Sequence, residues 1–154
     1  MSKEIDEHLL RFFDPKKLLG SGAYGHVWKV IDRSSKRPLA LKKIFDAFQN
    51  STDAQRTYRE ISILAQLDHP NIVKLDRVVR ARNNRDLYVA FEFMEADLHS
   101  LVGEGVLQAL HLKFIAFQIL KGLQYLHSAQ LLHRDLKPSN LLINSDCEGI
   151  SLPI

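Results

Sequence analysis

The chain has 154 residues, of which 45% are hydrophobic and 25% are charged. These proportions are typical of a globular protein with a buried core and exclude a disordered chain. The net charge of +3 comes from 21 Lys and Arg against 18 Asp and Glu spread along the sequence. We therefore predict no nucleic-acid partner, because such a partner would call for a concentrated basic stripe.

The first part of the chain has the composition of β-structure. Lys17–Leu19 leads into a glycine-rich turn, and the Val, Trp and Ile residues of 27–32 predict a strand. The polar residues 34–38 predict a turn, and residues 39–45 predict a third strand.

A helix is expected after the third strand. Thr52 and Gln55 have the spacing of a capping box, and apolar residues recur at helical spacing from Tyr58 to Leu67. His69-Pro70-Asn71 should end this helix, and two more strands are expected at 72–79 and 87–92. From Asp97 to about His127 the pattern predicts helix, and the segment from Phe114 to Leu126 is apolar on more than one side.

The single cysteine, Cys147, cannot form an internal disulfide, and the first six residues do not resemble a signal peptide. Both features favour an intracellular protein of the cytoplasm or nucleus. The acidic neighbours Asp146 and Glu148 disfavour a thiolate, so we interpret Cys147 as a bystander. The longest apolar run, 87–93, is much too short to cross a bilayer, and we expect no membrane partner.

Residues 20–27, Gly-Ser-Gly-Ala-Tyr-Gly-His-Val, have three glycines at G-x-G-x-x-G spacing. Glycines allow a tight turn and let backbone N–H groups approach phosphate oxygens. The spacing alone leaves three interpretations open: a kinase glycine-rich loop, a dinucleotide-binding loop and a simple turn. A strand rather than a helix is predicted to follow, which disfavours the dinucleotide loop, and His26 stands where a Walker A loop requires lysine.

Three further features follow in a fixed order. Lys42 ends the strand segment Leu-Ala-Leu-Lys, and Glu60 lies on the predicted helix, where its carboxylate could hold the Lys42 ammonium. Residues 133–140 then read His-Arg-Asp-Leu-Lys-Pro-Ser-Asn, which fits the catalytic loop of protein kinases. Each residue alone could have a purely structural role. Chance is a poor explanation, however, for four matches in this order: the glycine-rich segment, Lys42, Glu60 and residues 133–140.

The sequence resembles the MAP kinase group of Ser/Thr protein kinases, and most closely its atypical MAP kinase 15 (extracellular-signal-regulated kinase 7/8) branch. The similarity runs from about residue 10 to residue 147 and is carried by segments 42–48, 52–57, 91–98 and 133–140. It implies an α+β protein-kinase fold with a five-stranded antiparallel N-lobe, one helix and a partial helical C-lobe. The implied domains are an N-terminal extension (1–12), the N-lobe (13–93), the partial C-lobe (94–147) and a divergent tail (148–154).

The resemblance also implies a site that uses ATP and Mg²⁺. Asp135 would accept the proton of the substrate hydroxyl, Lys137 would contact phosphate, and Asn140 would ligate Mg²⁺, while Phe91 would guard the pocket behind the base. The expected nucleotide-binding residues are Leu19, Gly20, Ser21, Gly22, Ala23, Tyr24, Gly25, His26, Val27, Ala40, Lys42, Glu92, Met94 and Leu142. The implied partners are proteins phosphorylated on Ser or Thr, proline-directed in this family, and a regulatory partner protein.

The sequence departs from the family after Cys147. Kinases of this branch continue with an apolar strand and an Asp-Phe-Gly triplet that holds a second Mg²⁺, whereas this chain reads Glu-Gly-Ile-Ser-Leu-Pro-Ile. Losing one well-placed electrostatic group costs about 3–4 kcal/mol of barrier. We therefore expect a Ser/Thr kinase that is catalytically incomplete, and the alternative is a non-catalytic nucleotide- or partner-binding fragment. With partners for the 114–126 helix missing, we also expect marginal stability in the C-terminal part.

Overall fold

The computed structural model describes residues 4–23, 25–144 and 150–152. The chain divides into two compact units, the first comprising Met1–Ala65 and Leu75–Phe93, and the second Gln66–Lys74 and Met94–Ile154. Within the described residues no helix is both long enough and apolar enough to cross a membrane.

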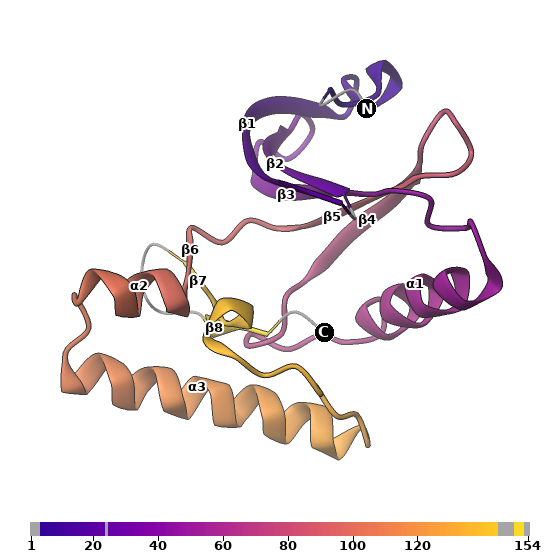
Figure 1. Cartoon of the computed structure of the whole chain (residues 1–154). Helices are drawn as coiled ribbons and strands as arrows, with labels where there is room; N and C mark the ends of the chain where they lie inside the picture. The colour runs from indigo at the N-terminus through magenta and orange to yellow at the C-terminus, as the bar shows by residue number, and fades with distance from the viewer. Residues whose placement is uncertain (1–3, 24, 145–149, 153–154) are drawn as a thin grey trace. The chain divides into compact units, whose positions relative to one another are not determined.

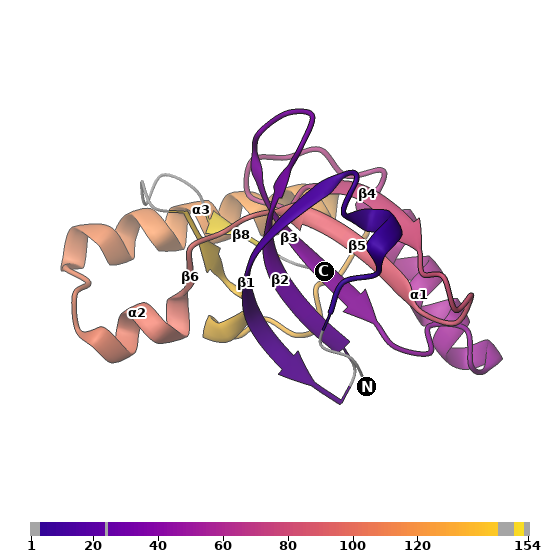
Figure 2. The same cartoon turned by 90° about the horizontal axis from the view of Figure 1, so that it is seen from above.

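The first unit is built on a five-stranded antiparallel sheet in the order β1-β2-β3-β5-β4 (Figures 1 and 2). Its elements are η1 (Glu7–Leu9), β1 (Phe13–Gly22), β2 (Gly25–Asp32), β3 (Pro38–Ile44), α1 (Ser51–Leu64), β4 (Leu75–Arg80) and β5 (Leu87–Glu92). The sheet and its single helix confirm the expected α+β class.

Strand register sorts the side chains of the sheet onto two faces, because paired residues in an antiparallel sheet point to the same side. The face that we call the Trp28 face carries the partly buried Glu92 and eight buried residues, namely His26, Trp28, Val30, Leu39, Leu41, Lys43, Tyr88 and Ala90. The opposite face, which we call the Lys42 face, carries Val27, Lys29, Ala40, Lys42, Val89 and Phe91. All of these except Val89 are only partly buried, so the two faces have different coverings.

The two faces are covered by different segments of the first unit. Leu9 is fully buried against Trp28, Val30 and Tyr88, and Ile5 and Phe12 pack against the same cluster. On the Lys42 face, Ile61 of α1 packs against a smaller cluster of Ala47, Leu87 and Val89. Figure 1 shows the N-terminal segment on one side of the sheet and α1 on the other.

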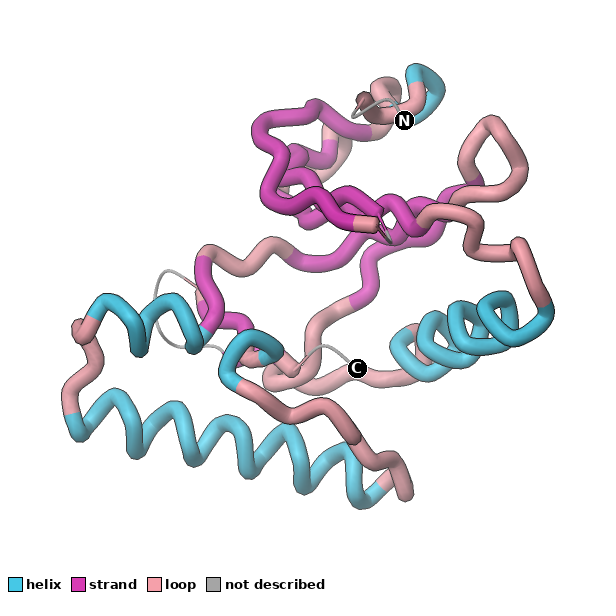
Figure 3. The backbone as a smooth tube through the Cα atoms, viewed as in Figure 1, coloured by secondary structure: helices cyan, strands magenta, loops and turns pink. Residues whose placement is uncertain are grey.

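The second unit combines two helices with a small antiparallel sheet in the order β6-β7-β8 (Figure 3). Its elements are β6 (Ala96–Asp97), α2 (Leu98–Glu104), α3 (Ala109–Ser128), η2 (Pro138–Asn140), β7 (Leu142–Ile143) and β8 (Ile150–Ser151). Its core contains Ile72, Leu98, Ile115, Leu126, Leu141, Ile143 and Leu152. As expected, α3 also leaves large apolar side chains exposed, among them Leu110, Phe114, Phe117 and Leu120.

The structure corrects three details of the predicted elements. The N-cap of α1 is Asn50, whose side chain accepts a hydrogen bond from the Asp53 backbone N–H, so the capping box at Thr52 was wrong. Helix α1 ends at Leu64 rather than Leu67, and β4 begins at Leu75 rather than at residue 72.

The helical stretch after Asp97 is also interrupted. Gly105, with φ of +67°, ends α2 in the left-handed region that glycine tolerates best, and α3 begins at Ala109.

The C-terminal residues form a strand that was not predicted from the sequence. β8 pairs with β7, and the backbone of Leu152 exchanges hydrogen bonds with Asn71 and Val73. Leu152 itself is fully buried. Residues 150–152 therefore belong to the β-structure of the second unit. Asp146, Cys147 and Glu148 lie outside the described residues.

Candidate functional site

The glycine-rich segment is the turn between β1 and β2, in which Gly22 pairs with Gly25 and Gly20 with Val27. A Cβ on Gly25 would clash with the carbonyl oxygen of Lys43, so this glycine is required for close packing against β3. A Cβ on Gly20 or Gly22 would meet no atom within 4 Å. These two glycines therefore leave open the space that a phosphate group would need. Tyr24 lies outside the described residues.

The side chains of this segment do not all face one way. Val27 lies on the Lys42 face, whereas His26 lies on the Trp28 face. The His26 ring is edge-on to Trp28 and to Phe45, with distances between ring centroids of 5.5 Å and 4.8 Å. Neither ring nitrogen of His26 has a hydrogen-bond partner among the described residues. The expected nucleotide contact of His26 is thus restricted to its backbone. Leu19, Ser21 and Ala23 are exposed.

Strand register brings Lys42 together with other predicted site residues. Val27 and Val89 are its direct cross-strand partners, and Ala40, two residues earlier, pairs with Phe91. A half-buried face that carries Lys29 and Lys42 among small and apolar side chains can hold an adenine ring and a phosphate. Glu92 is the last residue of β5, and Met94 is the first residue of the second unit after it.

The structure does not pair Lys42 with Glu60. No ion pair joins the two residues, although both are among those described. Helix α1 contacts the sheet through Ile61, the residue next to Glu60. The expected ammonium–carboxylate contact is therefore not made in this structure.

In the second unit, Asp135, Lys137 and Asn140 form one cluster. The Lys137 ammonium lies 2.9 Å from Asp135 Oδ2, and Asn140 Nδ2 donates hydrogen bonds to Asp135 Oδ2 at 2.8 Å and to the Asp135 backbone oxygen at 2.9 Å. Arg134, with φ of +64°, adopts the left-handed conformation just before Asp135. Strained backbone of this kind is found at functional sites.

The electrostatics of this cluster keep Asp135 ionised. The hydrogen bond from Lys137, followed by that from Asn140, lowers the pKa of the Asp135 carboxyl below its usual value. A carboxylate that is charged at neutral pH can accept a proton from a hydroxyl group.

Buried residues just after Asn140 hold the C-terminal end of the cluster in place. Leu141 and Ile143 are core residues, and the Leu141 carbonyl oxygen accepts a hydrogen bond of 2.8 Å from the Leu98 backbone N–H. Leu142, which alternates with them on β7, is only partly buried and pairs with Asp97. An alternating pattern of this kind leaves Leu142 available to contact a ligand.

The residues present fit Mg²⁺ and a nucleotide. The amide nitrogen of Asn140 is used in bonds to Asp135, which leaves its amide oxygen for a cation, and Mg²⁺ prefers oxygen ligands. No group of three His, Cys, Asp or Glu side chains is gathered for a metal anywhere in the described residues. Mg²⁺ would thus depend on phosphate oxygens as well, as it commonly does in kinases.

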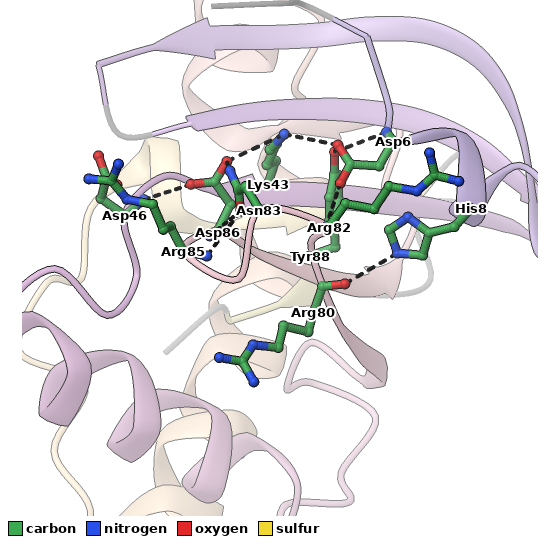
Figure 4. Close-up of polar contacts among 10 residues, drawn as sticks. All are labelled: Asp6, His8, Lys43, Asp46, Arg80, Arg82, Asn83, Arg85, Asp86 and Tyr88. Carbon is green, nitrogen blue, oxygen red and sulfur yellow. Dashed lines mark hydrogen bonds and ion pairs between the residues drawn. The ribbon is translucent and has the colours of Figure 1, made fainter.

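A second polar cluster in the first unit was not predicted. Lys43, Asp6, Asp86 and Tyr88 meet on the Trp28 face beside a cavity of about 560 Å³ (Figure 4). The sequence held one signal for it, because Lys43 follows Lys42 on a strand and must point to the opposite face. If that face is buried, the Lys43 ammonium requires carboxylate partners.

Comparisons with known proteins identify the family of the chain. The protein kinase domain family matches residues 13–152. The chain is 54% identical over 147 residues to extracellular signal-regulated kinase 2 of Dictyostelium discoideum, covering 95% of this chain and 40% of that protein. It is 51% identical over 149 residues to mitogen-activated protein kinase 15 of Caenorhabditis elegans (96% and 32%), and 50% identical over 147 residues to extracellular signal-regulated kinase 7 of Drosophila melanogaster (94% and 16%). The chain thus spans less than half the length of these relatives.

Proposed function

Because the chain belongs to the MAP kinase family of protein kinases, we propose that it carries the nucleotide-binding and proton-accepting residues of an ATP-dependent Ser/Thr protein kinase. One observation carries this proposal: Lys137 and Asn140 both lie within hydrogen-bonding distance of Asp135. Phosphoryl transfer depends mainly on positioning and charge stabilisation, which such a cluster can provide.

Each group has a role that follows from its chemistry. Gly20 and Gly22 let the backbone approach the phosphates, and the Lys42 ammonium neutralises phosphate charge. Asp135 orients the substrate hydroxyl and takes its proton, while Lys137 offers a cation to the transferred group. Mg²⁺ bound to ATP would neutralise charge on the phosphate oxygens, with Asn140 as a protein ligand.

A second candidate is a nucleotide-binding module that does not transfer phosphate. One observation favours it: no ion pair joins Lys42 and Glu60 among the described residues. An active kinase uses that ion pair to position ATP.

A transfer assay separates the two candidates. The purified chain is incubated with Mg-ATP labelled at the γ-phosphate and a Ser/Thr protein acceptor, with Asp135→Asn and Lys42→Met variants as matched backgrounds. Labelling above both backgrounds supports the kinase. Saturable ATP binding with labelling no higher than either background supports the binding module. A folded chain that neither binds nor transfers eliminates both candidates.

A further inference from the structure

Residues 4–12 lie before the region that matches the kinase family, yet they are part of the core of the first unit. Leu9 is fully buried, and Ile5 and Phe12 pack against the cluster around Trp28 and Tyr88. Covering this much apolar surface makes the segment an integral layer of the unit rather than a loose extension. We call residues 4–12 the N-terminal strap.

The strap is anchored by Asp6. Its Oδ1 lies 3.2 Å from the Lys43 ammonium and accepts a hydrogen bond of 2.9 Å from the Tyr88 hydroxyl, and its Oδ2 accepts one of 2.9 Å from the Arg82 backbone N–H. Lys43 also lies 3.4 Å from Asp86 Oδ2, so one ammonium joins the strap to the β4–β5 turn. Figure 4 shows these contacts as a single connected group.

The anchor is largely withdrawn from water. The side chains of Lys43, Asp6 and Asp86 are 10%, 17% and 11% exposed. Burial alone would raise the pKa of Asp6, but the hydrogen bonds from Arg82, Tyr88 and Lys43 outweigh it and lower the pKa. Removing one partner from such a group leaves a poorly solvated charge behind, so the contacts hold one another in place.

Lys43 connects this anchor to the nucleotide-binding elements in two ways. Its backbone carbonyl oxygen is the atom against which Gly25 of the glycine-rich turn packs. Its chain neighbour Lys42 points to the opposite face of the same strand, beside Val27 and Val89. A shift of Lys43 would therefore move both the glycine-rich turn and the Lys42 ammonium.

We propose that Asp6 is a positioning residue for the nucleotide site: by holding Lys43 on the Trp28 face, it fixes the part of β3 that seats Gly25 and presents Lys42. This inference rests on the proposed function, since it requires that the first unit bind ATP. Asp6 touches no nucleotide itself and acts only through β3. The strap is then a functional part of the nucleotide site although it precedes the family's matched region.

The test compares Asp6→Asn with Glu7→Gln, its neighbour. Both remove one carboxylate charge from the strap, but Glu7 is 80% exposed, and its one ion pair among the described residues is with the exposed Arg82 side chain. Affinities for Mg-ATP and for adenosine are measured in the full chain by calorimetry, at a temperature where circular dichroism shows every variant folded. Adenosine lacks the phosphates that Lys42 and the glycine-rich turn would contact, so it reports on the site without them.

We expect Asp6→Asn to weaken Mg-ATP binding by about threefold to tenfold, the usual range for mutations that act through a packed network. The affinity of Asp6→Asn for adenosine should be unchanged, and Glu7→Gln should bind both ligands as the unmodified chain does. In a Lys42→Met background, Asp6→Asn should have a smaller effect on ATP, because the group that it positions is gone. Tyr88→Phe, which removes only the hydroxyl donor to Asp6, should show a weaker form of the same change and serves if Asp6→Asn does not fold.

Two results would overturn the inference. One is an Asp6→Asn chain that is folded and binds ATP as the Glu7→Gln chain does. The other is an equal loss of ATP and adenosine binding, which would show that the anchor is structural only. Failure of the proposed function looks different, because the unmodified chain would then bind no ATP.

Discussion

Replacing Leu152 by Ala should destabilise the second unit. Leu152 is 0% exposed and lies in the cluster of Ile72, Ile115, Leu126 and Ile143. Buried Leu→Ala substitutions cost about 2–5 kcal/mol, through lost transfer free energy and the remaining cavity. A domain is stable by only about 5–15 kcal/mol, so the loss would be a large share of the total. Leu132→Ala is the matched control, since Leu132 lies in the same unit and is 66% exposed.

The assay is hydrogen exchange of the α3 amides, which reports on the second unit alone, together with urea unfolding. A double substitution sharpens it. A Cβ on Gly122 would stand 2.6 Å from Leu152 Cδ1 and 3.1 Å from the Asn71 carbonyl oxygen, so Gly122→Ala alone should cost about 1–3 kcal/mol through overpacking. In the Leu152→Ala chain, part of that cost should vanish because the cavity admits the new methyl group. If Leu152→Ala is no more destabilising than Leu132→Ala, Leu152 is not part of the core.

Three further predictions concern the sites. Gly25→Ala should lower the thermal midpoint of the first unit by several degrees, because the new Cβ meets the Lys43 carbonyl oxygen, whereas Gly22→Ala should keep the midpoint and weaken Mg-ATP binding; equal midpoints would refute the packing role of Gly25. Hydrogen bonds from Ser34 and Ser35, with the charge of Arg77, lower the pKa of the Asp32 carboxyl far below its usual value. As the pH falls, Asp32 is therefore protonated at a higher pH in the unfolded chain than in the folded chain. Stability of the first unit should therefore fall as the pH drops below about 4, and Asp32→Asn should flatten that slope in acid denaturation; an unchanged slope would count against the assignment. Asn140→Ala should weaken the Mg²⁺ dependence of ATP binding while leaving metal-free binding unchanged, as titration with and without a chelator would show.

The sequence predicted the strands of the first unit because residues that favour β-structure are concentrated in them. In β3, Leu39, Leu41 and Lys43 are buried while Ala40 and Lys42 are less so, and a period of two residues is enough to assign the faces of such a strand. The Asp135–Lys137–Asn140 cluster was equally readable, since the three residues lie within six positions of the chain and one short turn gathers them.

What the sequence did not predict depends on contacts between distant residues. Asp6 and Tyr88 are 82 positions apart, and no local sequence pattern indicates that the Asp6 carboxylate will be buried beside the Tyr88 hydroxyl. Glu60 lies at the expected position on α1, but its contact with Lys42 depends on how the helix packs, which helical periodicity does not determine. Leu152 became a core residue because it pairs with Ile72 in a parallel bridge, and register is a tertiary property.

Equilibrium binding of Mg-ATP to the purified chain tests the central claim most directly, with Lys42→Met as the control. We expect saturable binding with a dissociation constant at or below about 1 mM, which is the upper end of ordinary KM values. The Lys42→Met variant should bind Mg-ATP with clearly lower affinity. A folded chain that shows no saturation at millimolar Mg-ATP, or a variant that binds as tightly as the unmodified chain, would contradict it.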